Sequence, residues 1–308
     1  MPEGEAWTPP VTRELTGGGG RVLRYCCYGP ADGLPVVSLA GTPGTRWERP
    51  DVIAAFEQAG LRVATPDRPG YGGSTRQPGR TVADVAADVQ MIADAHRWPR
   101  FAVTGFSGGG PHALACAALL AGRVTCCAAV ATPAPADAPG VDFFAGRTPG
   151  QAEDFRLALR GEPALRAHLQ ARAGDAMAKF EADGPASPSG PPRASSCAPG
   201  RPAADPGRTA RIRAMFLGGL DGWVDDDLAL VRPWGFDLAR ISVPVSIWHG
   251  TQDTRVPRAH TDWLLAHLPT AQGHEYPDGH DPSGATHRQI LGWITATASG
   301  PRGDGTAR

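Results

Sequence analysis

The chain has 308 residues and a formal net charge of −1 at pH 7, a length that allows a sizeable core in one domain, with or without an inserted lid. A charge this close to zero provides no field that would attract nucleic acid or an anionic membrane surface. We find no apolar run of about 20 residues and no apolar signal segment near the first residue. We therefore expect a cytoplasmic protein with no nucleic-acid partner and no membrane partner.

Two strands are expected first in the chain, at 11–15 and 21–28. Four glycines separate them, which predicts an antiparallel hairpin at one edge of a sheet. Further short apolar runs predict strands at 36–40, 61–64, 101–104, 124–130 and 243–248. Apolar residues at helical spacing predict helices at 50–59, 82–96, 111–120 and 259–267. Strands that alternate with helices predict an α/β protein with a mostly parallel central sheet flanked by helices.

The alternation stops at 133–234, where helical fragments at 153–159 and 163–173 precede a stretch rich in Pro, Ser and Gly. An excursion of this length between two strands predicts an inserted helical cap, or lid. The domains that we predict are a core formed by 1–132 and 235–298, a helical cap at 133–234 with a mobile loop at 183–207, and a disordered tail at 299–308.

A glycine-rich stretch, TGFSGGGPH, carries Ser107 between an expected strand and an expected helix. A G-x-S-x-G sequence on such a turn is typical of a nucleophile elbow, whose strained backbone raises the serine hydroxyl above the sheet edge. Gly105 and Gly109 leave room for the turn, and the Gly108 N–H can bind an oxyanion with help from the following helix. A phosphate-binding loop is the rival interpretation, but the G-x-x-x-x-G-K-[ST] pattern is absent and no lysine lies nearby. The sequence assigns no role to Gly110.

An elbow serine needs a base and an orienting acid, which in this architecture follow it in the order acid, then histidine. Asp253 follows the strand expected at 243–248, where the orienting carboxylate belongs. His280 lies in a loop after a final strand that is expected to start at His274, and it is the candidate base. We assign the other histidines to packing, strand ends or the surfaces of helices and loops, with His260 among the surface group.

Metal binding is the alternative for some of these residues. His274, His280 and Asp281 form one conceivable site, but no further ligand spacing supports it, and the six cysteines form no C-x-x-C pair. The run Asp225-Asp226-Asp227 lacks the pattern of a calcium loop, so we interpret it as a solvated helix start before Leu228. We therefore expect no metal and no cofactor.

A second oxyanion donor is expected in the loop after the strand at 36–40. The tight turn Gly41-Thr42-Pro43-Gly44 lies there, and its Thr42 N–H can face Ser107. Together this turn, the stretch DRPGYGGS at 67–74, the elbow, HGTQD at 249–253 and Gly279-His280 resemble the α/β-hydrolase superfamily, in particular serine-nucleophile, esterase-like members with an inserted helical lid. These matches span almost the whole chain in the family's order.

Two positions and the Pro-rich lid segment depart from the pattern of that family, and the segment leaves the substrate unspecified. Ala40 stands where the family often has a histidine whose hydrogen bond braces the oxyanion turn. Asp281 follows the candidate base, where an apolar residue is common. A carboxylate at 281 would either raise the pKa of His280 or point outward without effect.

The resemblance and the serine at the elbow together imply acyl transfer, because haloalkane dehalogenases and epoxide hydrolases of this fold carry aspartate there. Ser107 would attack a carbonyl, His280 would accept its proton, Asp253 would steady the imidazolium, and the N–H groups of Thr42 and Gly108 would hold the oxyanion. The leading hypothesis is a hydrolase for a carboxylic ester, thioester or lactone of a small, moderately apolar substrate. Aromatic side chains that would line its pocket, or pack within the lid, are Phe106, Phe143, Phe144, Phe216 and Trp223.

Other activities remain open from the sequence. The same triad could run cyclisation or acyl transfer in biosynthesis, or hydrolysis of a carbon–carbon bond, with water excluded by the lid. The superfamily also includes small-molecule binding proteins with little turnover, and a fold alone does not choose among these functions. The sequence makes no prediction of the oligomeric state.

Overall fold

The computed structural model of the protein describes residues 7–182 and 207–299. The predicted mobile loop lies outside these residues except for Gly207, and the predicted tail lies outside them except for Ser299. Within the described ranges, no helix is long and apolar enough to cross a membrane.

The centre of the molecule is a mostly parallel sheet of eight strands among the described residues. The strands are β1 (Thr12–Thr16), β2 (Val22–Tyr28), β3 (Leu34–Leu39), β4 (Leu61–Pro66), β5 (Phe101–Phe106), β6 (Val124–Val130), β7 (Val245–Gly250) and β8 (Ala271–Tyr276). They follow the order β1-β2-β4-β3-β5-β6-β7-β8. The pairs that β2 forms with β1 and with β4 are antiparallel, and the other pairs are parallel. The mostly parallel sheet and the edge hairpin predicted from the sequence are both confirmed.

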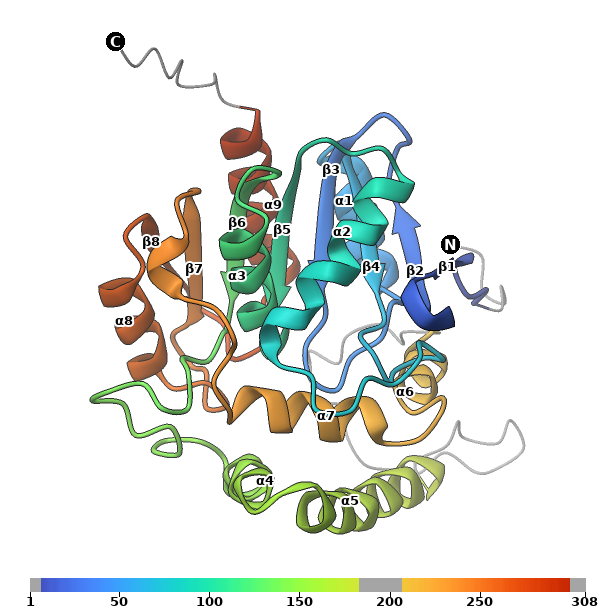
Figure 1. Ribbon diagram of the computed structural model, residues 1–308, viewed down its shortest axis with the longest axis vertical. Coiled ribbons are helices and arrows are strands. Elements are labelled where there is room, and N and C mark those ends of the chain that lie inside the picture. The colour runs from blue at the N-terminus through green and yellow to red at the C-terminus, as the bar shows by residue number, and fades with distance from the viewer. Residues whose placement is uncertain (1–6, 183–206, 300–308) are drawn as a thin grey trace, which may run out of the picture.

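Helices cover both faces of this sheet (Figure 1). They are α1 (Pro50–Gln58), α2 (Val85–Ala95), α3 (Gly109–Leu119), α4 (Pro149–Arg160), α5 (Glu162–Ala182), α6 (Arg208–Met215), α7 (Asp221–Leu230), α8 (Arg258–His267) and α9 (Gly284–Ala298). Helices α2, α3 and α8 pack on one face through Ile92, Leu114 and Leu264, while α1 and α9 pack on the other through Phe56 and Ile294. The parallel strands carry apolar side chains on both faces, and the helices on each side remove these side chains from water.

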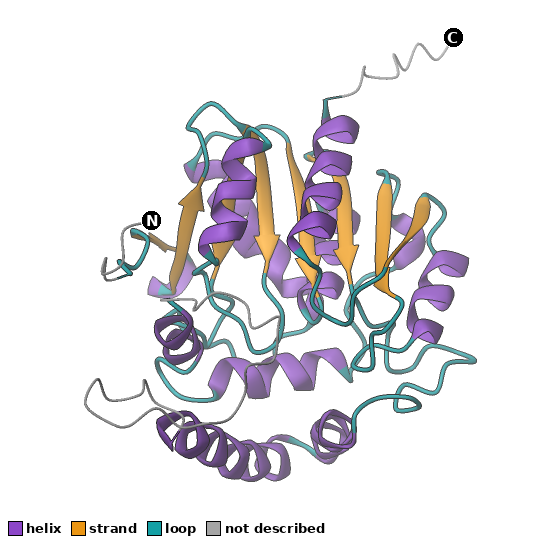
Figure 2. Ribbon diagram, turned by 180° about the vertical axis from the view of Figure 1, so that it is seen from behind, coloured by secondary structure: helices purple, strands orange, loops and turns teal. Residues whose placement is uncertain are grey.

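In the described part of the excursion between β6 and β7 lie four helices, α4 to α7, and we call them the excursion helices. In Figures 1 and 2, α7 crosses the edge of the sheet at which the parallel strands end, with α4 and α5 on its far side. The helical character predicted for this segment is thereby confirmed. Its role as a cap, and the domain boundaries drawn around it, stay predictions.

Two details of the sequence interpretation are wrong. The run Asp225-Asp226-Asp227 does not start a solvated helix but lies inside α7, and its residues are 2%, 0% and 3% exposed. Arginines from distant parts of the chain pair with the first two carboxylates, which makes their burial tolerable. His260, expected on a surface, is fully buried against Arg147 and Phe143.

Candidate active site

Three loops at the carboxyl edge of the sheet bring Ser107, Asp253 and His280 together. Ser107 follows β5 directly, Asp253 follows β7, and His280 follows β8. The His280 Nε2 atom lies 2.9 Å from Ser107 Oγ, and His280 Nδ1 lies 2.8 Å from Asp253 Oδ2. The sequence analysis named these three residues, and their side chains form one continuous hydrogen-bonded chain.

Ser107 occupies a left-handed backbone conformation with a φ of 53°, which is uncommon for a residue other than glycine. Its N–H donates to Val130 O at 2.8 Å, and its carbonyl accepts the Gly110 N–H at 2.9 Å. These bonds hold the strained turn between β5 and α3. The strand, turn and helix are those of the predicted nucleophile elbow.

Crowding around the turn explains its glycines, including the one to which the sequence assigned no role. A Cβ on Gly109 would lie 2.1 Å from Leu39 O. A Cβ on Gly110 would lie 2.0 Å from Thr132 Oγ1, at the end of β6. Side-chain atoms do not approach so closely, so α3 begins against β3 and β6 only with glycine at these positions.

Asp253 is held as an ionised acceptor. Its Oδ1 accepts the N–H groups of Arg255 at 2.8 Å and Val256 at 3.0 Å. Burial opposes ionisation, but the hydrogen bond and charge of His280 and the two N–H groups outweigh it, so the pKa of Asp253 lies below its usual value. An ionised carboxylate only accepts, so in the neutral form of His280 the proton is on Nδ1, and Nε2 can accept the Ser107 hydroxyl proton.

Two backbone N–H groups lie beside the serine. In the described part of the chain, neither Thr42 N–H nor Gly108 N–H has a hydrogen-bond acceptor. The two positions are close, because a Cβ on Gly108 would lie 3.4 Å from Thr42 N. Gly108 directly precedes α3, so the positive end of that helix adds to the field at this point. Unpaired donors next to a reactive hydroxyl are the arrangement that an oxyanion requires.

The turn Gly41-Thr42-Pro43-Gly44, which we call the oxyanion turn after its expected role, contacts a buried ionic cluster that the sequence analysis missed. Asp226 of α7 accepts from Arg68, from Arg80 at 2.6 Å and from the Tyr71 hydroxyl at 2.9 Å. Its Oδ2 also accepts the Thr42 hydroxyl at 2.7 Å. We call Arg68, Tyr71, Arg80 and Asp226 the Asp226 cluster. The stretch DRPGYGGS supplies two of its members, but no local pattern links that stretch to Asp226.

Charge balance in the Asp226 cluster keeps the carboxylate ionised. Burial favours the neutral acid, but the positive charges of Arg68 and Arg80 outweigh this and lower the pKa of Asp226 well below its usual value. Burial, followed by the charge of Arg68, lowers the pKa of the neighbouring His112 to about 3. His112 is therefore neutral near pH 7 and donates its Nδ1–H to Gly108 O at 2.8 Å.

The predicted pocket aromatics lie in different surroundings. The ring of Phe106 is 5.0 Å from the ring of His280, which places it beside the candidate base. Phe143 is buried against Phe144, with ring centroids 5.6 Å apart. Phe216 and Trp223 contact each other at 6.0 Å. Among the described residues, no ring pair joins these last four to His280 and no hydrogen bond joins them to Ser107, Asp253 or His280. Their role as substrate contacts stays a prediction.

The structure also shows the surroundings of Asp281 and Ala40, the two positions that depart from the family pattern. Asp281 is exposed beside His280, in keeping with the alternative in which it points outward. Ala40 lies at the start of the oxyanion turn, and its carbonyl accepts a hydrogen bond from Arg68. Among the described residues, no group of three His, Cys, Asp or Glu side chains is arranged to hold a metal ion.

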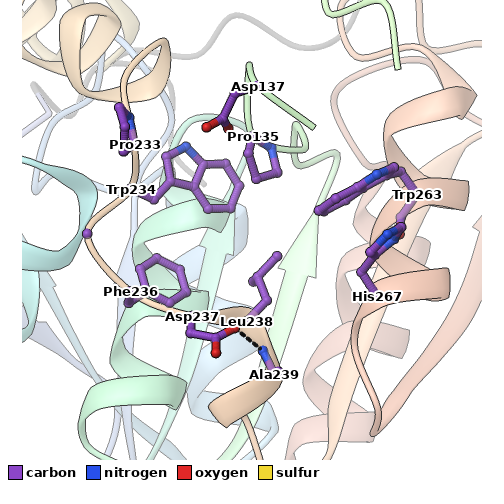
Figure 3. Close-up of a pocket in the computed structure, with 11 residues that line it drawn as sticks. Pro135, Asp137, Pro233, Trp234, Phe236, Asp237, Leu238, Ala239, Trp263 and His267 are labelled. Atoms are coloured by element: carbon purple, nitrogen blue, oxygen red, sulfur yellow. Dashed lines mark hydrogen bonds between the residues drawn. The ribbon is translucent and has the colours of Figure 1, made fainter. Parts of the chain in front are cut away.

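A cavity of about 510 Å³ lies elsewhere, beside α8 (Figure 3). Trp234 and Phe236 form one wall and Trp263 the other. Its full lining is Pro135, Asp137, Pro233, Trp234, Gly235, Phe236, Asp237, Leu238, Ala239, Trp263 and His267. None of the three hydrogen-bonded candidates lines it, so it is distinct from their site.

The parallel sheet, the serine on a strand-to-helix turn, and the acid and histidine on later loops define an α/β-hydrolase. A family model described as alpha/beta hydrolase fold matches residues 35–283. The chain belongs to this family and is a hydrolase of it, as the sequence motifs predicted.

Known proteins similar to this chain carry related descriptions. The putative carbamate hydrolase RutD of Variovorax paradoxus (strain S110) is 37% identical over 90 residues, which are 29% of this chain and 34% of that protein. The match thus spans about a third of the length of this curated relative.

Two solved structures share the fold over nearly the whole chain. The enol-lactonase from Burkholderia xenovorans LB400 has a TM-score of 0.61 at 19% identity and covers 92% of this chain and 100% of its own. A thermophilic esterase from Thermogutta terrifontis has a TM-score of 0.61 at 20% identity, with 92% and 96% covered. At these identities the likeness concerns the fold.

Proposed function

We propose that the protein is a serine hydrolase that cleaves a carboxylic ester, thioester or lactone through an acyl-enzyme on Ser107. The observation that carries this proposal is the hydrogen-bonded chain from Asp253 through His280 to the Ser107 hydroxyl. A hydroxyl becomes a competent nucleophile when a positioned base can take its proton.

The proposed reaction has two halves. In the first, Ser107 Oγ attacks the carbonyl carbon as its proton passes to His280 Nε2, and the N–H groups of Thr42 and Gly108 stabilise the oxyanion. His280 then gives the proton to the leaving alcohol, thiol or ring oxygen as the bond to it breaks. In the second half, His280 takes a proton from water, the hydroxide adds to the acyl carbon, and the acid leaves as Ser107 recovers its proton. Asp253 stays ionised and stabilises the imidazolium.

Two further observations support the choice of substrate class. The proteins with a similar fold include an esterase and an enol-lactonase, and a lactone is a cyclic ester. The Phe106 ring beside His280 offers an apolar contact for the acyl or alcohol group. The excursion helices would form the cap over this site and contribute further contacts.

The test combines turnover with covalent labelling. The protein is incubated with p-nitrophenyl butyrate and, separately, with a fluorophosphonate probe, and labelling is located by mass spectrometry. We expect ester turnover and labelling at Ser107, with both lost in Ser107→Ala. Ser299→Ala, an exposed serine after α9, is the matched control and should keep both.

The outcomes separate the alternatives. The absence of labelling in the folded wild-type protein would overturn every mechanism with Ser107 as nucleophile. Labelling at Ser107 without turnover of esters, thioesters or lactones would overturn the hydrolase proposal in favour of a transferase, a cyclase or a binding protein.

A further inference from the structure

We propose that Asp226, a residue of the excursion helix α7, is a positioning residue for the oxyanion hole. It would act through Arg68 and the Thr42 hydroxyl to fix the direction of the Thr42 N–H. This inference rests on the proposed function, because it assigns a task to an N–H group that would bind the oxyanion.

The first step of the argument concerns the peptide that joins Gly41 to Thr42. Arg68 Nη2 donates to Gly41 O at 2.8 Å. This peptide is trans and planar, so its C=O and N–H point in opposite directions. Fixing the Gly41 carbonyl therefore fixes the direction of the Thr42 N–H. A cation at the carbonyl also polarises the peptide and strengthens its N–H as a donor.

The second step concerns the side chain of the same residue. The Thr42 hydroxyl donates to Asp226 Oδ2 at 2.7 Å and accepts from Arg68 Nη2 at 3.2 Å. Hydrogen bonds thus fix the carbonyl that precedes Thr42 and the Thr42 side chain. The residues that form these bonds, Arg68 and Asp226, also form an ion pair with each other. The Thr42 N–H lies between the Gly41 carbonyl and the Thr42 side chain, so fixing both of these groups fixes its orientation.

The third step concerns the rigidity of Arg68 and Asp226, which together we call the clamp on Thr42. Arg68 and Asp226 are 3% and 0% exposed, and Arg68 approaches both carboxylate oxygens of Asp226. Arg80 and Tyr71 hold the same carboxylate from other sides. A buried carboxylate that accepts hydrogen bonds at both of its oxygens has few alternative arrangements. The clamp also bonds the Ala40 carbonyl, and so braces the turn where the family's histidine is missing.

A purely structural role for Asp226 is the competing explanation, and its neighbour provides the control. Asp225 is 2% exposed in the same helix and pairs with Arg76, but it does not contact the oxyanion turn. Asp225→Asn therefore loosens α7 from the core without touching Thr42. Thr42→Val removes only the hydroxyl link and keeps the backbone N–H, while Thr42→Ser keeps the link.

The experiment measures kcat and KM for p-nitrophenyl butyrate in the full chain with each substitution. We expect Thr42→Val to lower kcat by about 10- to 100-fold, a smaller fall than the removal of an oxyanion donor causes. The KM of this variant should stay within about 2-fold of the wild-type value. Thr42→Ser should restore kcat to within about 3-fold of wild type. Asp226→Asn should lower kcat by about 100-fold or more, whereas Asp225→Asn should lower the melting temperature with kcat within about 3-fold.

Two further readouts do not move with stability alone. The inhibition constant of a phenyl trifluoromethyl ketone, which forms an oxyanion on the serine, should rise in Thr42→Val relative to that of the methyl ketone. Amide hydrogen exchange in residues 40–46 should accelerate in Thr42→Val and Asp226→Asn, but not in Asp225→Asn. An unchanged kcat and unchanged exchange in Thr42→Val would overturn the positioning role while leaving the proposed function intact.

Failure of the proposed function gives a different pattern. A wild-type protein that neither turns over the ester nor reacts with the fluorophosphonate overturns the proposed function. In that case, faster exchange at 40–46 in Thr42→Val still supports the clamp on the turn, and unchanged exchange overturns it.

Discussion

Asp226 and Asp227 are adjacent in α7 and equally buried, yet their surroundings shift their pKa values in opposite directions. Two arginines face Asp226 and lower its pKa. Asp227 is desolvated and lies near the negative charges of Asp154 and Asp226, so its pKa is well above the usual value. Asp227 Oδ2 has no hydrogen-bond partner among the described residues. The surroundings therefore favour the ionised form of Asp226 and the protonated form of Asp227.

We predict that Asp227→Asn stabilises the protein near pH 7. A raised pKa means that the folded state holds a proton that the unfolded state releases above about pH 4, which costs stability as the pH rises through that value. An amide removes this cost because it never ionises. Urea unfolding should show a larger free energy of unfolding than wild type at pH 7 and a smaller gain at pH 3.5. A loss of stability at pH 7 would contradict the raised pKa of Asp227.

Gly110 offers a second test at the scale of one residue. We predict that Gly110→Ala lowers stability by about 1–3 kcal/mol and lowers turnover as well, because the new methyl group would overlap Thr132 and displace the turn that carries Ser107. Differential scanning fluorimetry and fluorophosphonate labelling rates measure the two effects. Gly122→Ala is the control, since a Cβ there meets nothing within 4 Å. Equal melting temperatures for the two variants would contradict the steric explanation.

At the scale of elements, α7 approaches the loop after β4 more closely than side chains normally permit. A Cβ on Gly222 would lie 2.4 Å from the Tyr71 ring, and a Cβ on Gly70 would lie 2.7 Å from Gly222 N. Glycine on both partners lets the helix backbone lie against the loop. This contact delivers Asp226 to the Arg68 side chain.

We predict that Gly222→Ala shifts α7 and destabilises the protein by about 1–3 kcal/mol, with a fall in kcat because the clamp on Thr42 moves with the helix. Gly150→Ala changes the second residue of α4, the same helical position, where a Cβ meets nothing within 4 Å. That control should be neutral or more stable by up to about 1 kcal/mol. The measurements are urea unfolding and ester turnover. Retention of full kcat in Gly222→Ala would contradict the coupling between α7 and the turn.

The elements and the site differ in how far the sequence predicts them. The strands and the elbow follow from local apolar runs and from glycine spacing around Ser107. The sequence analysis did not predict α9, although Ile290 and Ile294 stand four residues apart on its buried side. The burial of Asp226 has no local signal, because its partner Arg68 is 158 residues away in the chain. Three consecutive aspartates in a short helix predict an exposed position when only the local sequence is considered. The arginines that make their burial possible are distant in the chain.

On the scale of the whole molecule, ionic contacts join the excursion helices to the core. Arg76, in the core, pairs with Glu162 of α5 and with Asp225 of α7. Within the excursion, Arg166 of α5 pairs with Asp221 of α7. Partly exposed pairs of this kind contribute little individually, at most about 1 kcal/mol each. The Asp226 cluster differs from these pairs, because its arginines and its carboxylate are all buried.

We predict that the protein loses stability as the pH falls below about 6.5. Burial lowers the pKa of both His112 and His260 to about 3, whereas in the unfolded chain they titrate near 6.5. The unfolded state then binds more protons between pH 6.5 and 3, so each histidine removes up to about 1.4 kcal/mol of stability per pH unit. Below about pH 4, protonation of Asp226 in the unfolded chain adds to this loss.

Urea unfolding at pH 7, 6, 5 and 4 measures this dependence. His260→Gln should make the curve shallower between pH 6.5 and 4, because it removes one of the titrating groups. A curve for this variant parallel to that of wild type would contradict the neutral state assigned to His260.

The hydrogen bond from Thr42 to Asp226 has a consequence for exchanging parts between related enzymes. The excursion looks like a replaceable module, since it enters after β6 and leaves before β7. Its last helix nevertheless supplies the carboxylate that braces the oxyanion turn, so a graft that replaces α7 imports a foreign partner for Thr42 and Arg68. A chimera whose graft ends before α7 keeps this protein's α7 and with it the contact to Thr42. A chimera whose graft includes α7 depends on the donor's helix to make that contact.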